Sequence, residues 1–67
     1  MNQTNRLLSD IYRTAAIGKD TLSAVINSAD DAELIRDLSM KRAEYRDIKN
    51  VAAKNLARNG IKPPRNS

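Results

Sequence analysis

The 67-residue chain contains no cysteine, histidine, tryptophan or phenylalanine. Without cysteine it has neither a disulfide framework nor a thiol nucleophile. Without histidine it lacks the commonest general base and metal ligand. No apolar run approaches the roughly 18 residues that span a membrane, and the polar first five residues do not resemble a signal peptide. We therefore expect a cytoplasmic protein without a membrane segment.

Large aliphatic side chains are also scarce, since Leu, Ile and Val together number only 14. A chain of this length buries only about 60 % of the surface that its unfolded form exposes. Because no disulfide and no thiolate or imidazole metal site supports the core, self-association is the usual remaining source of stability. We expect one domain over residues 1–67 that forms a homo-oligomer.

Apolar and small residues in the first half of the chain recur in alternating steps of three and four, the spacing of one helix face. The pattern predicts a helix over about residues 5–27, capped at its start by Thr4 or Asn5. Gly18 falls within the pattern, where its missing side chain permits a close approach between helices. The predicted contact positions of this helix are Leu8, Ile11, Ala15, Gly18, Leu22 and Val25.

A second helical pattern predicts a turn over about residues 28–30 and a helix over about residues 31–58. Asp30 with Glu33, or Ser28 with Asp31, has the spacing of a capping box. These acidic residues also suit the positive end of the helix dipole, and no other ligand type accompanies them, so capping is preferred to a metal site. The predicted contact positions of this helix are Leu34, Leu38, Tyr45, Ile48, Ala52 and Leu56.

The second helix is expected to stop at Asn59-Gly60, because glycine adopts the left-handed conformation of a helix stop at little cost. Ile61 is placed to supply the apolar contact that often accompanies such a stop. Pro63 and Pro64 prevent the helix from resuming, which leaves residues 59–67 as a tail.

The predicted fold is therefore all-α: two antiparallel helices joined by a short loop into a hairpin. Each helix buries one stripe against the other and leaves its flanks in water. Two hairpins that associate as a homodimeric four-helix bundle cover those flanks. The contact positions named above are then the expected self-association residues.

Two lysines, Lys19 and Lys41, interrupt the apolar patterns, one on each predicted helix. A lysine on such a stripe can let its ammonium reach water along the stem, or set the register and oligomeric state at a cost in stability. It can also bind an anion. Asp37 and Glu44 are candidate partners for these ammonium groups, and the sequence leaves all three roles open.

The net charge of +4 arises near the C-terminus, where the last twenty residues contain five cations and no acid. Such a group suits nucleic acid or another acidic partner, but it also suits the negative end of a helix dipole. No aromatic side chain lies among these charges to stack on a base. The residues are Lys49, Lys54, Arg58, Lys62 and Arg65.

No catalytic arrangement is visible in the sequence. Paired carboxylates need a shielded pocket for acid–base chemistry, and two helices offer no evident cavity. Asp10, Asp20 and Asp47 point away from the apolar stripes, and Asp37 and Glu44 lie at a stripe's edge. We therefore expect no enzymatic activity, no cofactor and no metal.

Four groups of residues resemble the first helical hairpin of small bacterial ferritin-like proteins of unknown function. They are Leu7-Leu8-x-x-Ile11-Tyr12, Ile17-Gly18-x-Asp20-x-Leu22, Ala43-Glu44-Tyr45-x-x-Ile48 and Leu56-x-x-Asn59-Gly60. The resemblance covers about residues 6–62, or half of such a protein, and implies that a second copy replaces the missing half.

The resemblance does not extend to iron chemistry. Iron-handling ferritin-like proteins use inward-facing Glu and Glu-x-x-His residues, whereas this chain has no His and is expected to direct Lys19 and Lys41 inward. The expected function is a structural or protein-interaction module that self-associates. The alternative is a small nucleic-acid-binding or regulatory hairpin that uses the five C-terminal cations.

Overall fold

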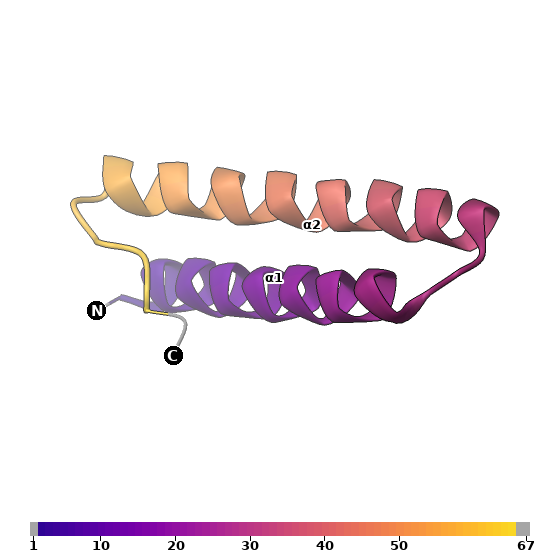
Figure 1. Ribbon diagram of the computed structural model, residues 1–67. Helices are drawn as coiled ribbons and strands as arrows, with labels where there is room; N and C mark the ends of the chain where they lie inside the picture. The colour runs from indigo at the N-terminus through magenta and orange to yellow at the C-terminus, as the bar shows by residue number, and fades with distance from the viewer. Residues whose placement is uncertain (1, 66–67) are drawn as a thin grey trace.

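The computed structural model describes residues 2–65. Helix α1 spans Gln3–Ser28 and helix α2 spans Ala32–Arg58, and the two run antiparallel (Figure 1). Residues 29–31 connect them, one residue later than the predicted turn. Within the described residues the chain has no strand. The predicted all-α hairpin is confirmed, with an elongated shape of 44 × 20 × 14 Å.

Both helix starts lie close to the predicted ones but use other caps. Asn2 caps α1, where its side-chain Oδ1 accepts a hydrogen bond from the Asn5 backbone N–H at 2.8 Å. Asp31 caps α2 by accepting from the Leu34 backbone N–H at 3.1 Å. The predictions of Thr4 or Asn5, and of Asp30 or Ser28, as caps were therefore wrong. Each rejected residue lies within a few positions of another side chain able to accept the same bond.

The end of α2 confirms the predicted glycine stop. Gly60 has φ 75°, and its backbone N–H donates to the Ala57 carbonyl at 3.0 Å. The Ile61 backbone N–H donates to the Leu56 carbonyl at 2.8 Å. These two bonds form a Schellman motif, which satisfies carbonyls that the helix end would otherwise leave unpaired.

A polar link joins the two ends of the hairpin. The Asn59 side-chain amide donates to Asn5 Oδ1 at 2.7 Å, across 54 positions of sequence. Asn5 is almost fully buried, so this bond satisfies an acceptor that water does not reach freely. Beyond Asn59 the tail turns back toward the first turns of α1 (Figure 1).

The buried residues gather at this end of the molecule. Leu56 is 0 % exposed and is the only large side chain among the described residues that is fully buried. The other buried residues are Asn5, Ser9, Ala15, Ala16 and Ala52. None of residues 17–51 is buried. The hairpin therefore has a closed half at its chain ends and an open half toward the loop.

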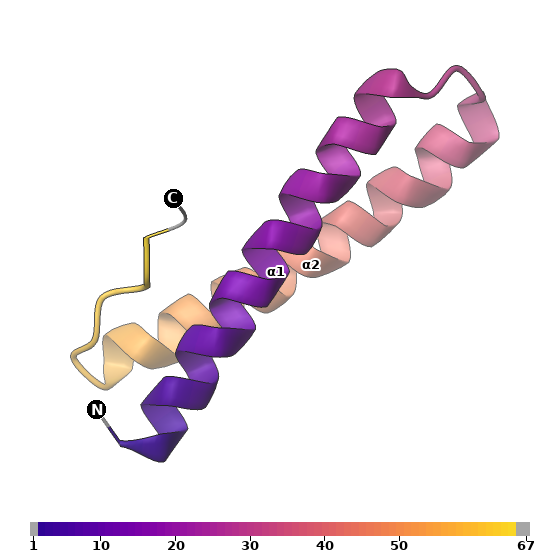
Figure 2. The ribbon, with the colours of Figure 1, turned by 90° about the horizontal axis from the view of Figure 1, so that it is seen from below.

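The two helices lie side by side in one view and cross near their middle in the other (Figure 2). Gly18 lies at this level of α1, where a Cβ atom added to it would be 3.2 Å from the Tyr45 ring. The missing side chain thus lets an aromatic ring of α2 lie directly on the backbone of α1. This agrees with the packing role expected for Gly18.

Candidate functional site

Three interhelical contacts establish which residues face each other. Besides the link between Asn5 and Asn59, Arg42 Nη1 donates to Ser23 Oγ at 3.2 Å. The Lys49 ammonium lies 5.4 Å from the centre of the Tyr12 ring. With the helices paired in this way, the positions of each helix that face the other helix recur every seven residues, as in an antiparallel coiled coil. They are Asn5, Tyr12, Lys19 and Ile26 on α1, and Ile35, Arg42, Lys49 and Leu56 on α2.

On one long side of the hairpin, three positions of each helix repeat at the same seven-residue interval. We call this set the open face, because α1 and α2 leave it in water. Its four aliphatic members Ile11, Val25, Leu34 and Ile48 are each 45–47 % exposed. The open face consists of Ile11, Gly18 and Val25 on α1 with Leu34, Lys41 and Ile48 on α2.

Two shallow apolar grooves lie on the open face, in the half of the hairpin that holds the chain ends. One groove of about 320 Å³ is lined by Leu7, Ile11, Tyr45 and Ile48 among others. A second of about 280 Å³ lies between Leu8, Ile11, Ile48 and Val51. Side chains of both helices line each groove, so the open face is one continuous surface across the hairpin.

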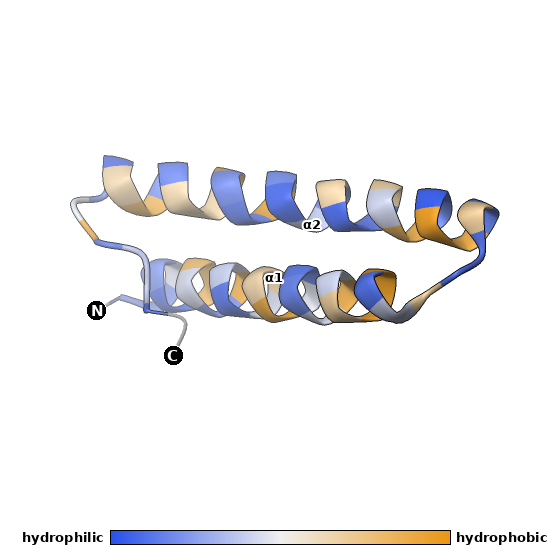
Figure 3. Cartoon of the chain, in the orientation of Figure 1, coloured by the Kyte–Doolittle hydropathy of each residue, from blue (hydrophilic) through white to orange (hydrophobic). Residues whose placement is uncertain are grey.

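The opposite long side has a different composition. Its seven-residue repeats hold small or polar side chains, and a polar groove of about 310 Å³ runs between the helices there. Hydrophobic and hydrophilic residues alternate along both helices, so neither helix is apolar all round (Figure 3). Of these repeat positions Ser9 and Ala16 are buried, Ser23, Ser39 and Ala53 are half-buried, and Arg46 is exposed.

The twelve predicted contact residues divide into three classes of exposure. Ala15, Ala52 and Leu56 are buried within the hairpin. Ile11, Val25, Leu34 and Ile48 lie on the open face. The remaining five are half-buried along the boundary between the helix interface and the open face: Leu8, Gly18, Leu22, Leu38 and Tyr45.

The two lysines singled out in the sequence have different environments. Lys19 lies at the edge of the groove between the helices with its side chain 31 % exposed, and its ammonium lies 4.0 Å from the Asp20 carboxylate. Lys41 is 57 % exposed and pairs with Glu44 at 2.9 Å. The hydrogen bond and charge of Glu44 raise the pKa of Lys41 above its ordinary value.

The expected inward direction of Lys41 was wrong. The residues of α2 that contact α1 include Arg42 and Lys49. Each of them follows directly after a position that the apolar pattern predicts to face α1, namely Lys41 and Ile48. A signal for both residues was present, because Arg42 and Lys49 continue the seven-residue spacing that ends at Leu56. Because both side chains are charged, the spacing of apolar residues does not identify them.

The five predicted anion-binding cations do not form one surface. The Lys49 ammonium lies over the Tyr12 ring, in the helix interface. Lys54 and Arg58 are exposed one turn apart on α2. Lys62 and Arg65 are exposed on the tail. The structure therefore separates Lys49 from the other four.

Residues 2–65 contain neither a metal-binding group of side chains nor a membrane-spanning helix. No group of three or more acidic side chains there could hold a metal ion. Neither helix has a stretch long and apolar enough to cross a membrane.

In comparisons with known proteins, no family model, curated protein or solved structure matches the chain. The resemblance to ferritin-like proteins thus stays a prediction. The geometry shows exposed apolar residues on one long side of the hairpin and a groove with three cations in its lining on the other.

Proposed function

We propose that the chain is a non-enzymatic self-association module whose open face packs against a second copy to form a four-helix bundle. The observation that supports this is one exposed side: Ile11 and Val25 of α1, and Leu34 and Ile48 of α2, are each 45–47 % exposed. The members of each pair are fourteen residues apart, or two seven-residue repeats, so they lie on one side of their helix. An apolar stripe on each of two adjacent helices is the surface that such bundles bury.

The exposed area shows that the hairpin is not a compact monomer. It exposes 5012 Å², whereas a compact monomer of its mass exposes about 4,250 Å². The excess reflects the elongated shape of 44 × 20 × 14 Å, and it leaves room for an interface of standard size, about 800 Å² on each partner. A second hairpin of the same dimensions supplies a matching surface, and self-pairing of one face is the rule in two-fold dimers.

The charge of Lys41 selects between two ways of stacking the hairpins. If the two-fold axis runs along the helices, α1 of one copy lies over α2 of the other, and Lys41 faces Gly18. If the axis runs across the helices, Lys41 faces Lys41 of the other copy, and the like charges repel. We propose the first arrangement, in which the lysine stem lies beside the Tyr45 ring that covers Gly18 and the ammonium reaches water beside Glu44.

Sedimentation equilibrium tests the dimer with two matched variants. Ile11→Glu places a carboxylate on the open face, where dimerisation would bury it unpaired. Ile17→Glu makes the same chemical change on an isoleucine that is 57 % exposed on the outer side of α1. We expect the wild type and Ile17→Glu at twice the 7.5 kDa chain mass, and Ile11→Glu to dissociate at least about tenfold more readily. A monomeric wild type, or equal weakening by both variants, would contradict the proposal.

Single introduced cysteines test the stacking, because the chain has none of its own. A chain with Val25→Cys is mixed with a chain with Leu34→Cys, and disulfide-linked heterodimers are counted after oxidation. The proposed arrangement brings these two positions together in different copies, so the mixed product should predominate. Predominant linkage in a mixture of Ile11→Cys with Val25→Cys chains would instead show the crosswise arrangement.

A further inference from the structure

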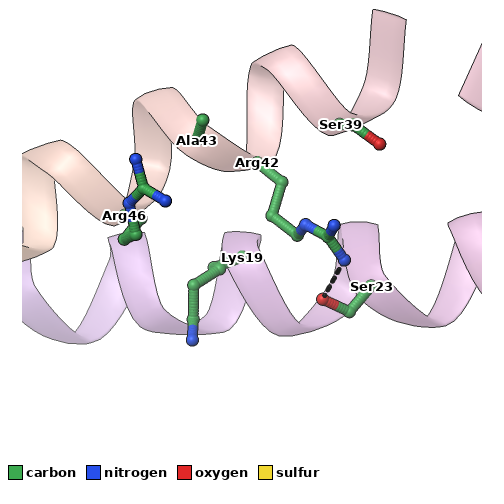
Figure 4. Close-up of a pocket in the computed structure, with 6 residues that line it drawn as sticks. All are labelled: Lys19, Ser23, Ser39, Arg42, Ala43 and Arg46. Carbon is green, nitrogen blue, oxygen red and sulfur yellow. Dashed lines mark hydrogen bonds between the residues drawn. The ribbon is translucent and has the colours of Figure 1, made fainter. Parts of the chain in front are cut away.

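The groove on the polar side is lined by cations from both helices. Its lining consists of Lys19 and Ser23 of α1 with Ser39, Arg42, Ala43 and Arg46 of α2. Three of these side chains are positive, two carry hydroxyls and none is acidic. Figure 4 shows the Arg42 guanidinium reaching across the gap to Ser23, with Lys19 and Arg46 farther along the groove.

Two of these three charges lie beside a carboxylate, and the third, Arg42, is bonded to a neutral group. The Lys19 ammonium lies at 4.0 Å from Asp20, and Arg46 lies at 3.4 Å from Asp47. Arg42 is half-buried, and over residues 2–65 its one recorded partner is the neutral Ser23 hydroxyl. A guanidinium has five N–H donors in a planar fork, so most of the hydrogen-bonding capacity of Arg42 remains for a ligand.

The position of these residues is costly for folding. Lys19 and Arg42 occupy helix-facing positions, where apolar side chains would stabilise the hairpin by burial. Two like charges in the same interface also repel each other. A ligand that neutralises them binds only the folded hairpin and therefore stabilises it.

We infer that this groove binds a small ligand with linked phosphate groups, centred on Arg42. Arginine pairs with phosphate oxygens through two parallel N–H donors, and the hydroxyls of Ser23 and Ser39 are further donors at the same level. In Figure 4 the charged ends of Lys19 and Arg46 point away from each other rather than toward one point. Charges spread in this way match a short chain of phosphates better than a single one.

The groove and the open face lie on opposite long sides of the hairpin. A dimer through the open face therefore leaves both grooves accessible, and the two proposals can fail independently.

Inorganic triphosphate is the probe, titrated into ¹⁵N-labelled protein at constant ionic strength. We expect backbone amide shifts to concentrate at the groove residues, with weaker binding of inorganic phosphate. Arg42→Gln and Arg46→Gln should each lower the affinity for triphosphate at least about fivefold, and the double variant more. Arg46 is exposed, so its variant should fold even if a change at Arg42 disturbs the helix interface.

The matched control removes the same two charges elsewhere, with Lys54→Gln and Arg58→Gln on the exposed outer turns of α2. This control should retain triphosphate affinity within about twofold. Equal loss in the control, or shifts centred on residues 54–62, would overturn the proposal because binding would then follow net charge alone. Stronger binding of a single-stranded oligonucleotide than of triphosphate at equal phosphate concentration would also overturn it, in favour of a nucleic-acid surface.

Discussion

The two halves of the hairpin are built from similar helical sequence but are packed differently. In the half that holds the chain ends, alanines bring the helices together, Leu56 is fully enclosed, and Asn5 and Asn59 are joined by a hydrogen bond. In the half that holds the loop, no residue is buried, and Leu22, Ile26 and Leu38 keep part of their surface in water. Small residues close one half, whereas larger aliphatic residues leave the other open.

This difference explains how a short chain can combine a fold with an interaction surface. The closed half has enough internal contacts to hold the helices in register, together with a Schellman motif and a polar link. Aliphatic side chains stay exposed in both halves, but the loop half has no buried residue of its own to hold its helices together. A partner on the open face would bury those side chains, so we expect folding and association to be coupled most strongly in the loop half.

Leu56→Ala should have the largest effect on stability. It removes a side chain that is 0 % exposed, the one large fully buried side chain within residues 2–65, and leaves a cavity, which costs about 3 kcal/mol. A domain of this size has little more than that in total, so the variant should be largely unfolded in dilute solution. Urea unfolding followed by circular dichroism measures the loss.

Leu38→Ala is the matched change in the loop half, where the leucine is only half-buried. In dilute protein the substitution should lower the free energy of unfolding by about 1 kcal/mol, because a half-buried leucine removes less apolar surface from water on folding. Its cost should rise with protein concentration as a partner covers the loop half. Equal costs for the two leucines in dilute protein would show that the two halves are equally closed.

Gly18→Ala tests the packing between the two halves. The sign of its effect on the free energy of unfolding should depend on whether Tyr45 is present. In the wild type the new methyl group meets the Tyr45 ring at 3.2 Å, and the overpacking should outweigh the gain in helix propensity by about 1 kcal/mol. In a Tyr45→Ala background the ring is gone, so the same change should stabilise the helix by about 1 kcal/mol. A double-mutant cycle of unfolding free energies measures this coupling. Stabilisation in both backgrounds would show that the ring moves aside without cost.

Much of the fold could be predicted from the sequence because its signals are local. The spacing of apolar residues identifies both helices, and Gly60 marks the end of the second through its own backbone preference. The caps were misplaced by one to three positions, because several neighbouring side chains can accept the same bond. Asn2 lies near Thr4 and Asn5, and Asp31 follows Asp30.

The side of each helix that contacts the other could not be predicted from the spacing of apolar residues. Periodicity gives the centre of an apolar stripe but not which part of that stripe a second helix covers. The observed choice places Tyr45 on Gly18 and joins Asn5 to Asn59, and it leaves Ile11 and Ile48 outside. It also brings Arg42 to the helix interface, which a search for apolar residues does not detect. These are tertiary preferences that depend on residues far apart in the chain.

Asn59→Ala should have a moderate effect confined to the closed half. The change leaves the buried Asn5 oxygen without its side-chain donor, which costs about 1 kcal/mol. Asn55→Ala is the control, because the Asn55 amide donates only within its own helix, to the Val51 carbonyl at 2.8 Å. Amide hydrogen exchange should quicken around Asn5 in the first variant and not in the second. Unchanged protection at Asn5 would show that the helices are held at this end without the polar link.

Lys41→Gln should have the smallest effect. The ammonium and the Glu44 carboxylate are both well exposed, and exposed ion pairs contribute little to folding. Because Glu44 raises the folded-state pKa of Lys41 above the ordinary value of 10.5, any contribution of the pair is present at neutral pH. It is lost as the pH rises through the raised value. Unfolding midpoints of dilute wild type and Lys41→Gln should therefore nearly coincide at pH 7 and converge fully in high salt. A large deficit for the variant at pH 7 would instead indicate that the ion pair is enclosed rather than exposed.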